Sequence, residues 1–141
     1  MNKRVTVVLD TNILISAVLF MGTPLKILKF CIIEEKIDVA ISPELMAEFV
    51  GKLKYKFGID AQTLAELKEL IEQSTQNFLP KYTSKICRDE SDNMILDLAI
   101  YAKAGFIITG DKDLLALKNH KGIEIMTAAG FLEKMTDLQS K

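Results

Sequence analysis

The chain has 141 residues, of which 49% are hydrophobic and 26% charged, and its formal net charge is -1. This length is typical of one domain with a single apolar core, and the charge excludes a polycation that binds nucleic acid over its whole surface. A single histidine, His120, excludes a two-histidine ribonuclease mechanism and, with only two cysteines in the chain, a Cys/His zinc site.

The two cysteines, Cys31 and Cys87, are far apart in sequence and lie in apolar surroundings. They lack the spacing of a metal site or of a disulfide framework, so we expect two buried free thiols in a reducing compartment. No apolar run approaches the ~20 residues that span a bilayer, and the first residues lack the pattern of a secretory signal. The sequence therefore predicts a cytoplasmic protein with no membrane contact.

Two kinds of apolar pattern alternate along the chain. Short runs rich in β-branched residues, beginning with Val5–Leu9, are typical of strands buried on both faces. Longer segments that open with a capping residue and a proline, such as Ser42 and Pro43, are typical of helices. The expected strands are 5–9, 38–41, 82–86, 106–108 and 123–126. The expected helices are 13–20, 23–35, 42–57, 60–78, 91–104, 111–117 and 128–134.

Strands that alternate with helices indicate an α/β fold with a mainly parallel sheet. No linker, internal repeat or low-complexity stretch divides the chain. We therefore expect one domain over residues 1–135, followed by a short C-terminal tail at 136–141.

Two of the expected strands lead into an aspartate. Asp10 follows the first strand directly, and Asp111 follows the strand at 106–108 after two residues. The carboxyl ends of parallel strands lie at the edge of the sheet where ligands bind, so both carboxylates are expected there. Each acid could instead cap the helix that follows it, but two caps at one edge are a weaker explanation. Adjacent anions need a cation, and oxygen ligands favour Mg²⁺ or Mn²⁺.

Two further acids lie on helices near these strand ends. Asp92 is in the first turn of its helix, where the helix macrodipole alone would favour an acid. Glu48 borders the apolar stripe of its helix, where it can reach into a crevice or pair with Lys52, four residues later. Glu44 is further from that stripe and is a lesser candidate. Asp97 is on the face opposite to the apolar positions of its helix, so we assign it to solvent.

Four segments together resemble the PIN domain (PilT N-terminus-like) nucleases and, among them, the single-domain VapC-like toxins of toxin–antitoxin pairs. They occur in family order over residues 5–115, and the last one is the most specific. The segments are Val-Leu-Asp10-Thr-Asn12, Ser42-Pro-Glu-Leu-Met-Ala-Glu48, Asp89-Glu-Ser-Asp92-Asn93 and Ile-Thr109-Gly110-Asp111-Lys-Asp113-Leu-Leu.

The resemblance implies a Rossmann-like three-layer α/β/α sandwich with a mainly parallel five-stranded sheet. It also implies an endoribonuclease that cuts single-stranded RNA with one or two Mg²⁺ or Mn²⁺ ions. By position, the catalytic acids are Asp10, Glu48, Asp92 and Asp111. The metal ligands are expected among Asp10, Asp92, Asp111 and the accessory acid Asp113. Asn12 and Thr109 match polar residues that hydrogen-bond the acids in the family.

Two alternatives stay open at this point. A receiver-type phospho-acceptor also uses acids at strand ends with Mg²⁺, but it needs an acid pair after the first strand, and Leu9 precedes Asp10. The other alternative is a catalytically silent RNA- or protein-binding module on the same fold, against which the complete acidic set argues.

An acidic pocket repels a polyanion, so RNA must also be held by cations. Lys52, one turn after Glu48, and Lys112, beside Asp111, are the expected RNA contacts, and Tyr55 offers a face for base stacking. Apolar residues crowd the first two helices, which with the resemblance predicts a homodimer or a complex with a small partner such as an antitoxin. These residues are Ile13, Leu14, Val18, Leu19, Phe20, Leu25, Ile27, Leu28, Phe30, Ile32 and Ile33.

Overall fold

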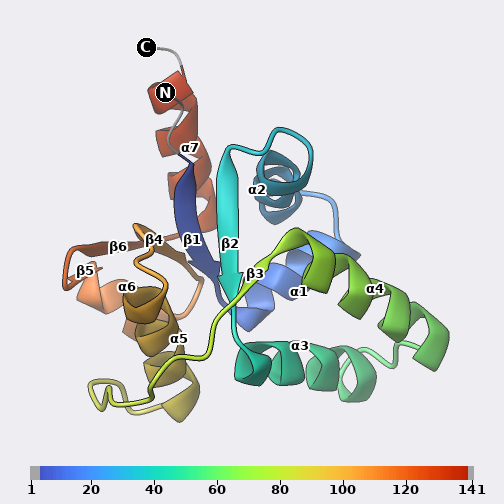
Figure 1. Cartoon of the computed structure of the whole chain (residues 1–141). Helices are drawn as coiled ribbons and strands as arrows, with labels where there is room; N and C mark the ends of the chain where they lie inside the picture. The colour runs from blue at the N-terminus through green and yellow to red at the C-terminus, as the bar shows by residue number, and fades with distance from the viewer. Residues whose placement is uncertain (1–3, 140–141) are drawn as a thin grey trace.

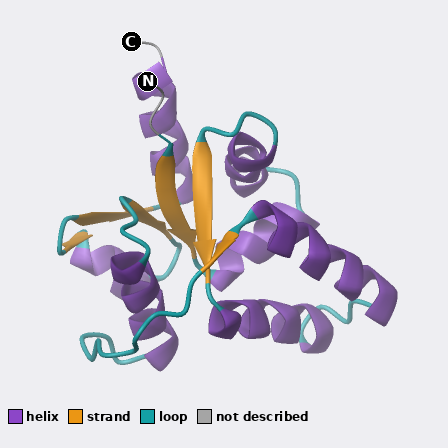
Figure 2. Cartoon of the chain, viewed as in Figure 1, coloured by secondary structure: helices purple, strands orange, loops and turns teal. Residues whose placement is uncertain are grey.

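The computed structural model describes residues 4–139, apart from the side chains of residues 30–32 and 137–139. In this part of the chain, seven helices surround one six-stranded sheet (Figures 1 and 2). The strands are β1 (Val5–Leu9), β2 (Ile37–Ile41), β3 (Gln76–Asn77), β4 (Phe106–Ile108), β5 (Asn119–His120) and β6 (Ile123–Met126). The helices are α1 (Thr11–Leu19), α2 (Thr23–Ile32), α3 (Pro43–Tyr55), α4 (Ala61–Ser74), α5 (Glu90–Tyr101), α6 (Lys112–Leu117) and α7 (Ala128–Gln139).

The strand order is β3-β2-β1-β4-β6-β5, and of the described strands β5 alone is antiparallel to its neighbour. This confirms the Rossmann-like α/β sandwich with a mainly parallel sheet. The expected number of five strands is wrong, because residues 119–126 form a hairpin that adds β5 at one edge. Lys121 and Gly122 form its two-residue turn in the left-handed region, with φ of 51° and 85°.

β1 is at the centre of the core. Val7, Val8 and Leu9 are at most 1% exposed, as a continuous apolar run predicts for a strand covered on both faces. α5 packs against β1, β2 and β4, while α2 packs against β2, α1 and α7. Because the helices bury this strand from both sides, its carboxyl end has a fixed position at the edge of the sheet.

The segment between α4 and α5 differs from the sequence-based expectation. The helix expected to reach Phe78 ends at Ser74, and the residues after it join the sheet as β3. The Phe78 N–H donates to the Ile41 carbonyl at 2.8 Å, and the Phe78 ring meets Tyr101 edge-on at 6.2 Å. Pairing with β2 and packing against α5 therefore replace further helical turns.

The strand expected at 82–86 is also wrong. We call residues 82–88 the strap, because side chains of α5 hold its backbone where a strand neighbour otherwise would. Asn93 accepts from the Ile86 and Cys87 N–H groups at 3.1 and 2.9 Å and donates to the Cys87 carbonyl at 3.0 Å. Ser84 donates both its backbone N–H and its hydroxyl to Asp97.

The assignment of Asp97 to solvent is therefore wrong, since this residue is 4% exposed. The helical-wheel argument assumed that only one face of the helix is covered. In the structure the sheet covers one side of α5 and the strap covers the face that carries Asp97.

α7 ends at Gln139 rather than near Lys134, so the segment from residue 136 to 139 continues this helix. Among the described residues, no single helix is long and apolar enough to span a membrane. α1 and residues Thr23–Lys29 of α2 reach that length and apolarity only as a pair bent by 88°.

We expect Asp97→Ala to lower the free energy of unfolding by about 1–3 kcal/mol, because it leaves the Ser84 N–H without an acceptor. Asp97→Asn keeps one carbonyl oxygen as an acceptor, so its free energy of unfolding should fall clearly less than that of Asp97→Ala. Urea unfolding of the two variants measures the difference. Equal losses would mean that the charge of Asp97, rather than its hydrogen bonds to the strap, is what stabilises the fold.

Candidate metal centre

The crevice that holds the acids opens where the strand order reverses. β1 is followed along the chain by β2 on one side, while β4 pairs with its other side. In open α/β sheets, ligands bind at the carboxyl ends of the two strands that flank such a point. Asp10 and Asp111 are in this position, and in Figure 1 β1 and β2 point down toward the same end of the molecule as α3 and α5.

The structure brings the four expected catalytic acids to one cavity. It has a volume of about 100 Å³, and Asp10, Glu48, Asp92 and Asp111 line it together with a fifth acid, Asp89. A neighbouring cavity of about 500 Å³ shares Asp10, Asn12 and Asp111 and adds Lys112 and Asp113. The acids come from the start of α1, from α3, from the first turn of α5 and from the start of α6, so four separate segments meet here.

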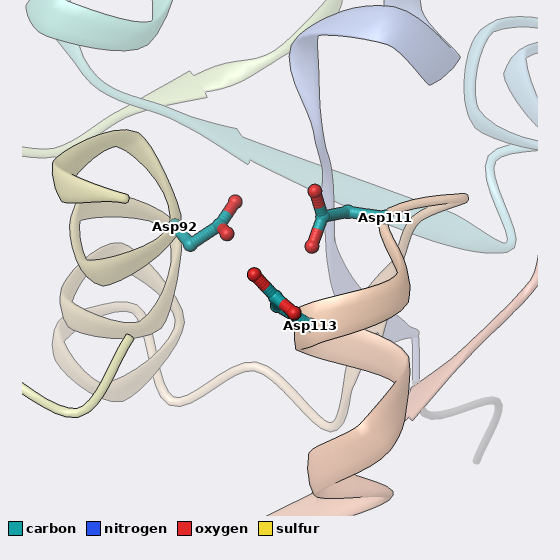
Figure 3. Close-up of side chains that lie close together, drawn as sticks. All are labelled: Asp92, Asp111 and Asp113. Atoms are coloured by element: carbon teal, nitrogen blue, oxygen red, sulfur yellow. The ribbon is translucent and has the colours of Figure 1, made fainter. Parts of the chain in front are cut away.

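Three of the acids are placed to share a cation. Asp92, Asp111 and Asp113 each offer a carboxylate oxygen, and these oxygens lie within 4.8 Å of one another. Figure 3 shows the three side chains pointing toward a common space between α5 and α6. Asp10, which was also expected among the ligands, lines the cavity but is not part of this triad.

Asp92 supplies a test of whether this triad suits a metal. The residue is 7% exposed, and its Oδ2 has no hydrogen-bond partner in the described part of the chain. A buried carboxylate oxygen without a donor is costly, and a cation beside it would remove that cost. Three carboxylates with no nitrogen or sulfur donor form a set that suits Mg²⁺ or Mn²⁺. The residues present therefore fit a hard divalent cation.

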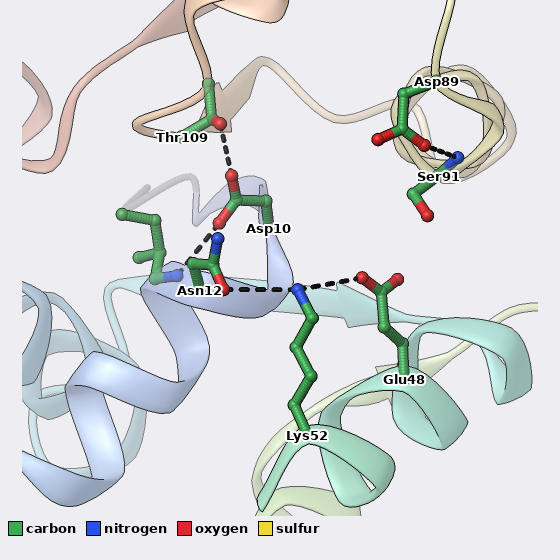
Figure 4. A network of polar contacts seen from close by, with 8 residues as sticks. Asp10, Asn12, Glu48, Lys52, Asp89, Ser91 and Thr109 are labelled. Carbon is green, nitrogen blue, oxygen red and sulfur yellow. Dashed lines mark hydrogen bonds and ion pairs between the residues drawn. The ribbon is translucent and has the colours of Figure 1, made fainter. Parts of the chain in front are cut away.

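Thr109 connects the ends of the two central strands. Its hydroxyl, fully buried, donates to Oδ2 of Asp10 (Figure 4). The same hydroxyl accepts from the backbone N–H of Asp111 at 2.9 Å. Oδ1 of Asp10 accepts from the Ile13 N–H at 2.9 Å and caps α1. Burial raises the pKa of Asp10, while the hydrogen bond from Thr109 acts in the opposite direction. Asp10 is thus fixed through both of its oxygens.

Glu48 and Lys52 form an ion pair on the other side of the cavity. The Lys52 Nζ lies 3.2 Å from Oε1 of Glu48 and donates to Oδ1 of Asn12 at 3.3 Å (Figure 4). Asn12, expected to hydrogen-bond an acid, accepts from this lysine, which is the ion-pair partner of the acid Glu48. The pair holds Glu48 toward α1.

Burial raises the pKa of Asp92 to about 6, and the charges of Asp111 and Asp89 add to the effect. Burial, followed by the Asp92 charge, also raises the pKa of the Cys87 thiol. Cys87 is a free cysteine and only half-buried, so its expected full burial is wrong. The side chain of Cys31 lies outside the described residues.

The sequence analysis assigned no role at this site to three residues. Asp89 caps α5 by accepting from the Ser91 N–H at 2.9 Å, and both residues line the smaller cavity. Arg88 pairs with Asp113 at 3.2 Å. Two features of the sequence could have pointed to Arg88. It lies directly before the acidic run, and it is one of only two arginines in the sequence, the other being Arg4.

We expect Asp92→Asn to stabilise the metal-free protein above pH about 6, with a gain that vanishes below pH 3.8. The raised pKa means that the folded parent binds more protons than the unfolded chain between these values, so its stability falls as the pH rises through them. Urea unfolding in EDTA at both ends of the window measures this. Asp60→Asn is the control, because hydrogen bonds from Thr63 lower the pKa of Asp60 and no gain is expected. A pH-independent gain for Asp92→Asn would contradict the prediction.

Residues 6–113 match the family model described as PIN domain. Over 93% of this chain and 92% of the relative, the sequence is 35% identical to an uncharacterized protein of Methanocaldococcus jannaschii. The matched range contains the acids of both cavities. The chain belongs to the PIN domain family.

Proposed function

We propose that this protein is an endoribonuclease that uses Mg²⁺ or Mn²⁺ to hydrolyse phosphodiester bonds in single-stranded RNA. The observation that carries the proposal is the buried Oδ2 of Asp92, which has no donor in the described part of the chain and lies in a triad with Asp111 and Asp113. PIN domains are typically metal-dependent nucleases, so the family supports the same chemistry.

Each acid has a separate task in this proposal. Asp92, Asp111 and Asp113 would hold the metal. When bound, the ion supplies a water of lowered pKa and positive charge beside the scissile phosphate. Thr109 and the Ile13 N–H keep Asp10 oriented at the shared wall of the two cavities. Lys52 orients Glu48 from the opposite side.

Two lysines would contact the RNA. Lys52 lines the smaller cavity and already has Glu48 and Asn12 as partners, so it acts on substrate together with that acid. Lys112 is exposed and lines the larger cavity beside Asp111. Both positions allow a phosphate to be held close to the triad, which would otherwise repel it.

The finer biological role is part of the same proposal. We infer that the protein is a toxin of a toxin–antitoxin pair that acts on cytoplasmic RNA and is neutralised by a small protein partner. Support comes from the order and spacing of the four motifs, which resemble VapC-like toxins. Expression of the parent should then arrest growth, and a variant without nuclease activity should not.

We also propose a homodimer formed through the first two helices. Leu14, Ile27 and Leu28 are buried within the chain and cannot contribute. Phe20 and Ile33, by contrast, are 57% and 69% exposed and remain available for a second copy. The side chains of residues 30 and 32, expected in the same interface, lie outside the described residues.

Asp10→Asn should lower RNA cleavage by about ten- to a hundredfold while the protein stays folded. The asparagine can still cap α1, but it removes the negative charge from the wall shared by both cavities. The measurement is cleavage of pooled cellular RNA by purified protein in Mg²⁺, in Mn²⁺ and in EDTA. Asp60→Asn is the matched control, because Asp60 caps α4 in the same way, away from the site.

Cleavage that persists in EDTA, or in Asp10→Asn at the parent's rate, would contradict the proposed mechanism. RNA binding by the parent without any metal-dependent cleavage would instead favour the catalytically silent module.

Light scattering should show a dimer, and Ile33→Lys should raise its dissociation constant by about tenfold or more, since it puts a charge into an apolar contact. Leu79→Lys is the control, because Leu79 is equally exposed, at 70%, next to the strap. A parent that is monomeric at high micromolar concentration would contradict the homodimer.

A further inference from the structure

Arg88 is a cation at the metal triad that the proposed mechanism does not use. Its Nη2 lies 3.3 and 3.2 Å from the two carboxylate oxygens of Asp113. The side chain is 88% exposed, so most of the guanidinium faces solvent beside an acid that also belongs to the triad.

The backbone on either side of Arg88 is held in place. Asn93, 4% exposed, binds the backbone of Ile86 and Cys87 through three hydrogen bonds. Asp89, the next residue along the chain, caps α5. Both sequence neighbours of Arg88 therefore have fixed positions, and these place Arg88 beside the site. Asn93 acts as a positioning residue for it.

The negative charge that surrounds Arg88 changes when a metal binds. Among the described residues, six carboxylates line the two cavities. Lys52 pairs with Glu48, Arg88 pairs with Asp113, and Lys112 also lines the larger cavity, so the acids outnumber these cations. The metal-free site is thus strongly negative. A divalent cation at the triad would draw the charge of Asp113 away from Arg88, leaving an exposed guanidinium at the mouth of the site without a full counter-charge.

We propose that Arg88 is a phosphate-binding residue of this site. It neutralises Asp113 in the metal-free protein and holds a phosphate of the RNA backbone once the metal is bound. A guanidinium suits this task because its planar N–H groups can bind two oxygens of one phosphate. The inference rests on the proposed function, since it takes single-stranded RNA as the substrate.

The first test measures metal affinity without RNA. Arg88→Ala should bind Mn²⁺ as tightly as the parent or several-fold more tightly, because the arginine competes with the metal for Asp113. If Arg88 merely oriented Asp113 for the metal, Arg88→Ala would bind Mn²⁺ more weakly than the parent. Arg4→Ala is the matched control: Arg4 pairs with Asp38 at 2.7 Å, at the amino ends of β1 and β2, far from the acids. Titration calorimetry with MnCl₂ reports all three affinities.

The second test measures binding of an unstructured RNA oligonucleotide in Ca²⁺ against salt concentration, with the RNA checked for integrity on a gel. Arg88→Ala should weaken binding about tenfold. The slope of log K against log salt should fall in magnitude by about 0.7, the value for one phosphate contact on a single strand. Arg88→Lys should keep the slope but lose part of the affinity, and Arg4→Ala should match the parent.

Weaker Mn²⁺ binding by Arg88→Ala, or unchanged RNA affinity and salt slope, would overturn the role of Arg88 while leaving the nuclease proposal intact. A parent that neither binds nor cleaves RNA would overturn both. Because the side chain is exposed and its loss leaves the strap's hydrogen bonds to Asn93 and Asp97 in place, Arg88→Ala is expected to fold, and its thermal unfolding verifies this.

Discussion

Mutual repulsion among carboxylates is the constraint to which the rest of the site responds. Like charges gathered at the end of a sheet destabilise the fold unless each has a donor or a cation nearby. Three of the acids cap helices: Asp10, Asp89 and Asp111. Two others pair with basic side chains, Glu48 with Lys52 and Asp113 with Arg88. Among the acids described, Asp92 alone keeps a buried oxygen without a donor. The negative charge of the triad is therefore not fully balanced by donors or cations.

Capping and metal chemistry are not competing explanations at this site. Asp10 uses Oδ1 to cap α1 and receives the Thr109 hydroxyl at Oδ2, while the same side chain lines both cavities. Asp111 likewise caps α6 through Oδ1 and belongs to the triad. A helix start is rigid and supplies oriented N–H groups, so a capping carboxylate is held with little rotational freedom. Such an acid is suited to a site that needs fixed oxygens.

Elements whose signals are local could be predicted from the sequence. The run at Val5–Leu9 forms β1, and Ser42 with Pro43 opens α3 by the expected cap, with the Ser42 hydroxyl accepting from the Leu45 N–H. The family motifs likewise pointed to the acids that the structure brings to one cavity.

The errors occur where the deciding partner is distant in sequence. The end of α4 depends on Phe78 meeting Ile41 and Tyr101, and the strap depends on Ser84 meeting Asp97. A helical wheel has no means of showing that a second segment covers the polar face of α5. Arg88 was missed for the same reason, because its partner, Asp113, is 25 residues away.

The two edges of the sheet are its shortest strands. β3 and β5 have two residues each, whereas the central β1 and its neighbour β2 have five. An exposed strand edge is a template for pairing with other chains, and a very short one offers too few N–H and C=O groups in line to act as such. The folded chain therefore offers little strand edge for pairing with another copy, which leaves the helices and loops as the larger surface for contact between copies.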